Sequence, residues 1–84
     1  MIRHHDVSDL HFDGDDMILT IDGHVRRFKI RDISSVLLNA TSRERNTYEV
    51  SPSGYGVHWP LIDEDLSIDG LLGVSHGKRA AKLA

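Results

Sequence analysis

Apolar and polar residues alternate in the first part of the chain, a pattern typical of β-strands that have one buried face. We expect a first strand over residues 6–13, with Ser8, Leu10 and Phe12 on the same side. A turn-forming run of Asp and Gly separates it from a second strand, which we expect over residues 17–21. The pattern therefore predicts the start of an antiparallel sheet.

The pair Asp22-Gly23 is the strongest local signal in the chain. Asp-Gly pairs favour a two-residue type I′ turn, because both central residues of that turn need a positive φ angle. The pair predicts a hairpin whose return strand covers residues 24–30, with Phe28 and Ile30 on the face expected in the core. The opposite face carries three basic residues, Arg27, Lys29 and Arg31.

An amphipathic helix is predicted next. Four apolar residues recur with the i, i+3, i+4, i+7 spacing that places side chains on one helical face: Ile33, Val36, Leu37 and Ala40. We expect this helix to pack on the sheet with Asp32 as its N-cap, because a carboxylate accepts hydrogen bonds from the free N–H groups of a first turn. Thr41 and Glu44 have the spacing of a capping box and predict a separate helical turn over residues 42–46.

A second hairpin and a short helix are expected in the last part of the chain. The hairpin strands cover residues 47–51 and 55–59, and Pro60 ends the second strand because it lacks an N–H donor. The helix carries three apolar residues, Ile68, Leu71 and Leu72. Asp65 or Ser67 is expected as its N-cap and Gly73 as the glycine that ends it. We expect residues 1–73 to form one domain and residues 74–84 to be a disordered basic tail.

These elements predict an α+β fold: a small antiparallel sheet of about five strands in two or more hairpins, one packed helix and a short C-terminal helix. The 84 residues, 39% hydrophobic and 27% charged, are typical of a single small domain. Ten side chains are expected to be mostly buried: Leu10, Phe12, Leu19, Ile21, Phe28, Val36, Leu37, Val57, Trp59 and Leu71. The chain has no cysteine, which suits a reducing compartment, and no apolar run approaches the ~20 residues that span a bilayer, so a cytoplasmic location is expected.

Charge is distributed unevenly around the overall net charge of −3. Residues 24–45 contain six basic and two acidic residues, or +4, whereas residues 61–73 contain four acidic residues and no basic one, or −4. We expect the two segments on opposite faces, with the acidic one at the start of the last helix. Such a dipolar surface favours an oriented partner over a polyanion.

Possible metal ligands form only weak patterns. The triplet 63–65 offers carboxylate oxygens, which Mg²⁺ and Ca²⁺ prefer, but carboxylates before a predicted helix more often cap its N–H groups. The other candidate group consists of His4, His5, His11, Asp13, Asp15 and Asp16. It lacks the spacing of known metal sites, so we expect adventitious nickel or zinc binding, no dedicated metal site and no cofactor.

Residues 53–72 read Ser-Gly-Tyr-Gly-Val-His-Trp-Pro-Leu-Ile-Asp-Glu-Asp-Leu-Ser-Ile-Asp-Gly-Leu-Leu. With Leu-Leu-Asn-Ala-Thr at 37–41 and Arg-Asn at 45–46, this run resembles the domain of unknown function 2442 family over roughly residues 6–73. The chain departs from the family at residues 33–36, where members often carry a proline or an aromatic residue. The resemblance implies a small α+β fold of hairpins with a packed helix, genes that often neighbour another small domain in toxin–antitoxin-like pairs, and no established catalytic residues.

Three functional hypotheses remain. The leading one is a non-enzymatic interaction module, the antitoxin-like or regulatory half of a two-gene pair, which binds a small basic protein encoded nearby; its candidate residues are His58, Asp63, Glu64 and Asp69. The alternative is a nucleic-acid-binding module that uses Arg27, Lys29, Arg31, Arg43 and Arg45. The third is a small enzyme or ligand-binding domain around His58, although a lone Trp beside it is more often a core residue. A membrane partner is not expected, and the oligomeric state is left open.

Overall fold

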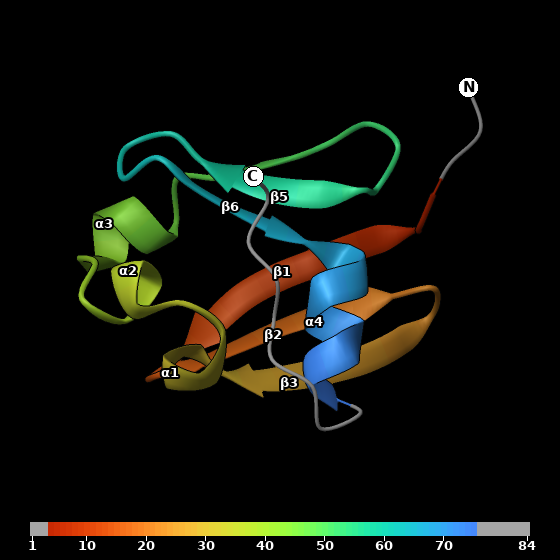
Figure 1. Cartoon of the computed structure of the whole chain (residues 1–84), viewed down its shortest axis with the longest axis horizontal. Coiled ribbons are helices and arrows are strands. Elements are labelled where there is room, and N and C mark those ends of the chain that lie inside the picture. The colour runs from red at the N-terminus through yellow and green to blue at the C-terminus, as the bar shows by residue number, and fades with distance from the viewer. Residues whose placement is uncertain (1–3, 76–84) are drawn as a thin grey trace.

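The computed structural model describes residues 4–75, which form two three-stranded antiparallel sheets and four short helices (Figure 1). The first sheet has the order β1 (Val7–Asp13), β2 (Asp16–Ile21), β3 (His24–Lys29). Helices α1 (Ile30–Ile33), α2 (Ser35–Leu38) and α3 (Ser42–Arg45) lead to the second sheet. That sheet has the order β4 (Glu49–Val50), β5 (Gly56–Trp59), β6 (Glu64–Ser67), and α4 (Ile68–Ser75) follows it. The expected α+β class is confirmed.

The turn between β2 and β3 is the predicted two-residue hairpin. Ile21 pairs with His24, and both central residues have positive φ, 51° at Asp22 and 82° at Gly23. These angles match a type I′ turn, whose twist suits the right-handed twist of the flanking strands. The sequence signal was sufficient because the turn geometry depends only on these two residues.

A β-bulge changes which side chains of β1 face the core. The register with β2 shifts between Ser8 and His11, and Asp9 lies in the left-handed region at φ 55°. The extra residue moves the alternation by one position. Val7, which pairs with buried Ile21, therefore packs against the core, and Ser8 is exposed. The expectation that Ser8 shares a face with the buried residues of the strand was wrong.

The helix predicted from residue 33 onward is interrupted. α1 already begins at Ile30, and extended backbone at Ser34 (φ −164°, ψ 112°) separates it from α2. The Ser34 hydroxyl accepts a hydrogen bond from the Leu37 N–H at 3.0 Å and so caps α2. Asp32 lies inside the first turn of α1 and is not an N-cap, which corrects the prediction.

The interruption also changes which side chains are buried. Because Ser34 resets the helical phase, one stripe does not continue from α1 to α2. Val36 is 37% exposed and was wrongly expected in the core, whereas Ile30 and Ile33 are buried. The separate helix α3 does begin with the predicted capping box, since Thr41 and Glu44 exchange side-chain and backbone hydrogen bonds of 2.8 and 3.1 Å.

Strand β6 was not predicted. It pairs antiparallel with β5, so that Trp59 lies opposite Glu64 and Val57 opposite Leu66. The Ser67 hydroxyl accepts a hydrogen bond from the N–H of Gly70 at 2.9 Å, as expected for the cap of the last helix. α4 then continues to Ser75, so Gly73 does not end it. The predicted tail lies mostly in residues 76–84, outside the described part of the chain.

One core joins both sheets and α4 (Figure 1). Eight of the ten residues predicted for it are buried: Leu10, Leu19, Ile21, Phe28, Leu37, Val57, Trp59 and Leu71. Phe12 is partly buried against them. Six further apolar residues outside these ten are buried: Met17, Ile18, Ile30, Ile33, Leu66 and Ile68. The Trp59 indole N–H donates to the Arg45 carbonyl oxygen at 2.9 Å, which satisfies its polar atom inside the core.

Candidate functional site

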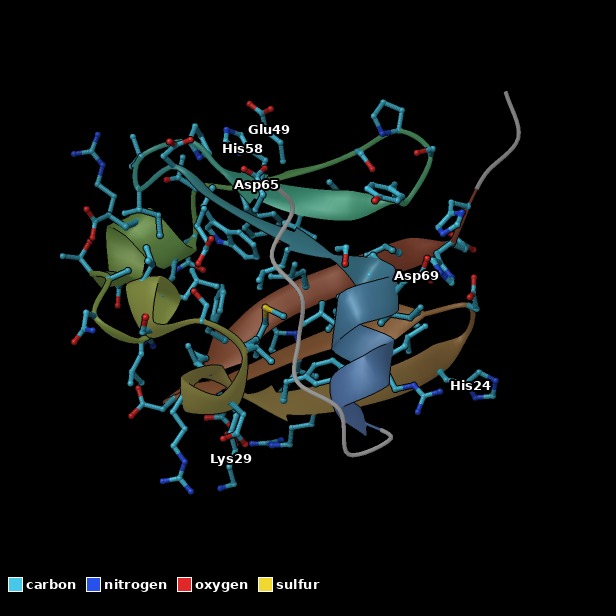
Figure 2. The ribbon with its side chains drawn as sticks, viewed as in Figure 1. His24, Lys29, Glu49, His58, Asp65 and Asp69 are labelled. Carbon is cyan, nitrogen blue, oxygen red and sulfur yellow. The ribbon has the colours of Figure 1, made fainter. Side chains whose placement is uncertain are left out.

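Three polar side chains form a row across the outer face of the second sheet (Figure 2). The strand register pairs Glu49 of β4 with His58 of β5, and His58 with Asp65 of β6. Successive side chains along a strand point to opposite faces, so this row lies opposite the buried side chains of Val57 and Trp59. Because Val57 and Trp59 face the core, the side chain of His58 between them faces solvent.

Hydrogen bonding within this polar row is asymmetric. The His58 Nδ1 atom lies 2.7 Å from the Asp65 Oδ1 atom, and the two side chains are 40% and 34% exposed. The Glu49 side chain is exposed and forms no hydrogen bond or ion pair with another residue in the described part of the chain. The row therefore offers one carboxylate that holds the imidazole and one that remains available to a partner.

A groove of about 220 Å³ lies beside the polar row. All three row residues line it, together with the apolar side chains of Val50, Pro52 and Tyr55. Tyr55 is 46% exposed. No Lys or Arg is among the residues that line the groove. It thus combines apolar surface with two carboxylates and suits a ligand that is both apolar and positively charged.

Nucleophilic catalysis lacks support in this geometry. A carboxylate that holds His Nδ1 also occurs in hydrolytic triads, but there a nucleophile lies within hydrogen-bond reach of the other ring nitrogen. Ser51 lines the groove, yet its hydroxyl accepts hydrogen bonds from the N–H groups of Tyr55 (2.9 Å) and Gly56 (3.1 Å). No described residue is hydrogen-bonded to His58 Nε2.

The four residues predicted to bind a partner lie in different environments. Asp63 is exposed in the turn before β6, with φ 50°, and Glu64 is 4% exposed, with its carboxylate accepting a hydrogen bond from the Ser34 hydroxyl. Asp69 lies in the first turn of α4, and only His58 lies in the groove. The expectation that residues 63–65 begin a helix was wrong, because they form a turn and the start of a strand.

Two of the basic residues in the nucleic-acid hypothesis are engaged within the protein. Arg27 donates hydrogen bonds to Asp16 and Asp13, both at 2.9 Å, and these bonds raise the pKa of its guanidinium. Arg45 donates to the carbonyl oxygens of Leu37 (3.0 Å) and Gly14 (2.9 Å) and so ties α2 to the β1–β2 turn. The remaining three, Lys29, Arg31 and Arg43, are exposed.

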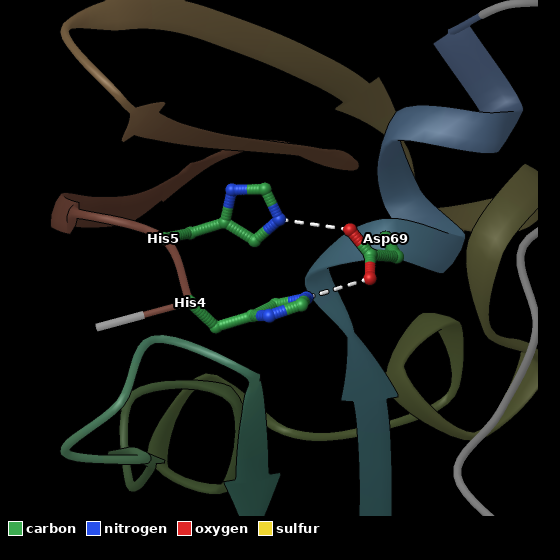
Figure 3. Close-up of side chains that lie close together, drawn as sticks. All are labelled: His4, His5 and Asp69. Atoms are coloured by element: carbon green, nitrogen blue, oxygen red, sulfur yellow. Dashed lines mark hydrogen bonds and ion pairs between the residues drawn. The ribbon is translucent and has the colours of Figure 1, made fainter. Parts of the chain in front are cut away.

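A second group of imidazoles and carboxylates joins three distant segments, and Figure 3 shows three of its members, His4, His5 and Asp69. His5 lies between two carboxylates: its Nδ1 atom is 2.7 Å from Asp22 Oδ2, and its Nε2 atom is 2.8 Å from Asp69 Oδ1. The His4 Nε2 atom lies 2.7 Å from the other oxygen of Asp69. We call His4, His5, Asp22 and Asp69 the terminal cluster. It explains why Asp69, although exposed, is already paired.

Contacts within the terminal cluster shift the pKa values of His5, Asp22 and Asp69. Hydrogen bonds to Asp22 and then Asp69 raise the pKa of His5. Hydrogen bonds from His4 and then His5 lower the pKa of Asp69, and the backbone N–H of Asp6 is the largest cause of the lowered pKa of Asp22.

The histidines and acidic residues grouped in the sequence do not all meet in the fold. His11 contacts the Asp9 carbonyl oxygen instead of joining His4 and His5. Asp69 pairs with His4 and His5, although the sequence did not connect it with them. The acidic residues expected beside these histidines were Asp13, Asp15 and Asp16. No local signal indicates this meeting, because Asp69 is distant in sequence.

Two three-stranded sheets joined by short helices define a small α+β domain, and comparison with known proteins identifies its family. The family model described as "Protein of unknown function (DUF2442)" matches residues 7–77, so the chain belongs to this family. A crystal structure of a protein of unknown function from Rhodospirillum rubrum ATCC 11170 is similar, with a TM-score of 0.68 and 23% sequence identity over 94% of both chains. This similarity supports the fold alone. None of the curated proteins compared with the chain matches it.

No helix within residues 4–75 has the length and apolar character needed to cross a membrane. The longest of them, α4, has only eight residues. A bilayer requires about 20 residues in a helix.

Proposed function

We propose that this domain is a non-enzymatic interaction module that binds a basic segment of a second protein in the groove of the second sheet. The observation that carries the proposal is the polar row of Glu49, His58 and Asp65 beside a partly apolar groove with no lining Lys or Arg. Opposite charges across an interface steer association and select the partner. The binding surface that we propose is therefore this face of the second sheet, and no longer the acidic segment 63–69 that the sequence suggested.

The groove suits a Lys or Arg side chain on an otherwise apolar segment. The methylene groups of such a side chain pack on apolar surface, here Val50, Pro52 and Tyr55, while the charged end stays near carboxylates. Tyrosine is enriched at protein interfaces because its ring is large and rigid and its hydroxyl forms hydrogen bonds. The half-exposed ring of Tyr55 therefore supports a protein partner over a small ion.

The other two hypotheses have weaker support. An enzyme around His58 requires a nucleophile or a substrate-activating group, and Ser51 is engaged with backbone N–H groups. A nucleic-acid interface depends on cations that can pair with phosphates, and the bonds of Arg27 to Asp16 and of Arg45 to the Leu37 carbonyl leave three of the five candidates for that role. We place the interaction in the cytoplasm, as the antitoxin-like or regulatory half of a two-gene pair whose other product carries the basic segment.

The test measures association of the neighbouring gene product with the full chain at low salt. The double variant Glu49→Gln/Asp65→Asn removes two charges from the groove and is expected to slow association about tenfold. The matched control Asp9→Asn/Asp32→Asn removes two charges from exposed positions outside the groove and is expected to bind like the wild type. Thermal melting checks that both variants are folded.

Three results would contradict the proposal. The first is association of the groove variant at the wild-type rate, and the second is an equal loss in the control variant. The third is a wild-type chain that does not bind the neighbouring product at all. Asp63→Asn, measured in parallel, distinguishes the groove from the β5–β6 turn, because Asp63 does not line the groove.

A further inference from the structure

We propose that His4, His5 and Asp69 bind a divalent transition-metal ion of the zinc class, with Asp22 holding His5 in position. These residues lie outside the polar row and do not line the groove, although the His4 ring lies 5.5 Å from the ring of Tyr55, which does. Its ligand atoms are two imidazole nitrogens and a carboxylate oxygen. Zn²⁺ accepts this combination, and three protein ligands leave a fourth tetrahedral position for water.

The distances already approach those of a coordination shell. One ligand atom from each of His4, His5 and Asp69 lies within 4.8 Å of the other two. Ligands about 2.0–2.1 Å from a tetrahedral Zn²⁺ are about 3.3 Å apart. The Nε2 atoms of His4 and His5 lie 2.7 and 2.8 Å from the two different oxygens of Asp69, so a small movement of these side chains admits the ion between the two nitrogens and the carboxylate. The ion replaces the protons that now lie between nitrogen and oxygen.

His5 is oriented as metal-binding histidines usually are. In such sites the ring nitrogen that does not bind metal is held by a carboxylate or carbonyl, which sets the ring orientation. Here Nδ1 of His5 is 2.7 Å from Asp22, whose other oxygen accepts a hydrogen bond from the Asp6 N–H at 2.8 Å. The His5 side chain is only 14% exposed. Its Nε2 atom is therefore directed at Asp69 by a contact that the metal would not disturb.

Backbone contacts position the two histidines independently of their side chains. The Ser53 carbonyl oxygen accepts hydrogen bonds from the N–H groups of His4 (2.5 Å) and His5 (3.2 Å). Gly54 approaches so closely that a Cβ atom there would lie 1.8 Å from the His5 carbonyl oxygen. The segment that carries both ligands is thus fixed on the β4–β5 loop before any ion binds, which distinguishes it from two adjacent surface histidines.

Solvent reaches the site from the side of His4 and Asp69, whose side chains are 45% and 59% exposed. This access allows an ion to enter and a water molecule to complete the shell. The bound ion would join the N-terminal segment to α4. Metal binding requires neutral imidazoles, so affinity is expected to rise from pH 6 to pH 8, roughly the range in which histidine loses its proton.

The experiment titrates tag-free, metal-stripped full chain with ZnCl₂ by calorimetry, and with CoCl₂ by visible absorption. One ion per chain and the intense absorption of tetrahedral Co²⁺ are expected. His5→Gln and Asp69→Asn are each expected to weaken binding at least tenfold, as loss of one of three ligands requires. Asp22→Asn retains every ligand and, because Asn also suits a type I′ turn, the hairpin; it is expected to weaken binding about tenfold.

His11→Gln and His24→Gln are the controls, since both histidines are exposed and outside the ligand group. They are expected to bind like the wild type. Equal weakening in the controls, or unchanged binding by Asp69→Asn, means an adventitious ion only and overturns the site. Melting curves in EDTA show whether each variant is folded, and a melting temperature that Zn²⁺ raises in the wild type but not in Asp69→Asn supports the site independently.

Discussion

His58 and His5 each lie next to two carboxylates, but the two sites are built differently. Glu49 and Asp65 flank His58 through the register of a single sheet. The His58 imidazole is 40% exposed, and the Glu49 carboxylate has no hydrogen-bond or ion-pair partner among residues 4–75. This site retains free charge on an open face, as a surface that meets another molecule requires.

The charged groups of the site around His5 pair with one another within the chain. Its carboxylates come from Asp22 in a hairpin turn and Asp69 in α4, 17 and 64 residues away. The His5 side chain is 14% exposed, and both carboxylates are hydrogen-bonded. The same pair of functional groups therefore stays open to solvent where strands place it on an outer face. It holds distant segments together where tertiary contacts enclose it.

The largest expected effect tests whether the polar row depends on the core beneath it. Trp59 neighbours His58 in β5 but is fully buried and hydrogen-bonded to Arg45. Trp59→Ala is expected to lower the free energy of unfolding by about 3–5 kcal/mol, because it leaves a large cavity. His58→Ala, on the opposite face, is expected to lower it by less than about 1 kcal/mol. Urea denaturation measures both, and equal midpoints would show that the two faces of β5 are not distinct.

The next effect tests how firmly the terminal cluster is positioned. Gly54 has φ 71° and no room for a Cβ atom beside His5, whereas Gly14 has φ 58° and open space around it. Gly14→Ala should cost only the unfavourable backbone conformation, about 1 kcal/mol. Gly54→Ala adds the displacement of the His5 backbone and should cost about 1–3 kcal/mol more. The same denaturation measurement gives both values, and a Gly54 variant as stable as the Gly14 variant would show that the contact with His5 is not needed.

The smallest effect is a pH dependence that the terminal cluster contributes. The pKa of His5 is raised above its ordinary value of 6.5, so its contribution to stability is complete below that pH and is lost as pH rises through the raised pKa. The pKa values of Asp22 and Asp69 are lowered below 3.8, so their contribution is present above that pH and is lost only in stronger acid. The cluster should therefore stabilise the fold most between pH 3.8 and pH 6.5, the ordinary pKa values of the carboxylates and of histidine. The His4 imidazole also faces Asp69.

Melting temperatures in EDTA, between pH 5.5 and pH 8.5, measure this contribution. The wild type and His11→Gln are expected to lose more stability over this range than His5→Gln, which lacks the imidazole that titrates. A decline of equal size in all three chains would assign the pH dependence to other groups.

Structure that depends on neighbouring residues was predictable from the sequence. Asp22-Gly23 determines its own turn, and Thr41 with Glu44 forms its own capping box. The break at Ser34 was not predictable, because the apolar spacing across it still fits one helix. β6 was missed because its acidic residues suggested a cap for the helix that follows.

The candidate site was only partly predictable for a related reason. His58 was identified as a candidate, but its neighbour Glu49 was not, because cross-strand neighbours depend on the register and not on local sequence. Had residues 64–67 been assigned to a strand, a short turn after Trp59 would have placed Asp65 beside His58 as well. The meeting of His5 with Asp69 depends on the packing of α4 and had no local signal.

The contact between His4 and Asp69 closes a loop of 65 residues, which has a consequence for the order of folding. Loop closure has an entropic cost that grows with loop length, whereas the β2–β3 hairpin closes over a two-residue turn. We therefore expect the hairpin to form early and the N-terminal segment to dock last. The N–H groups of His4 and His5 should accordingly exchange with solvent faster than those of β2, through a local opening that leaves both sheets intact.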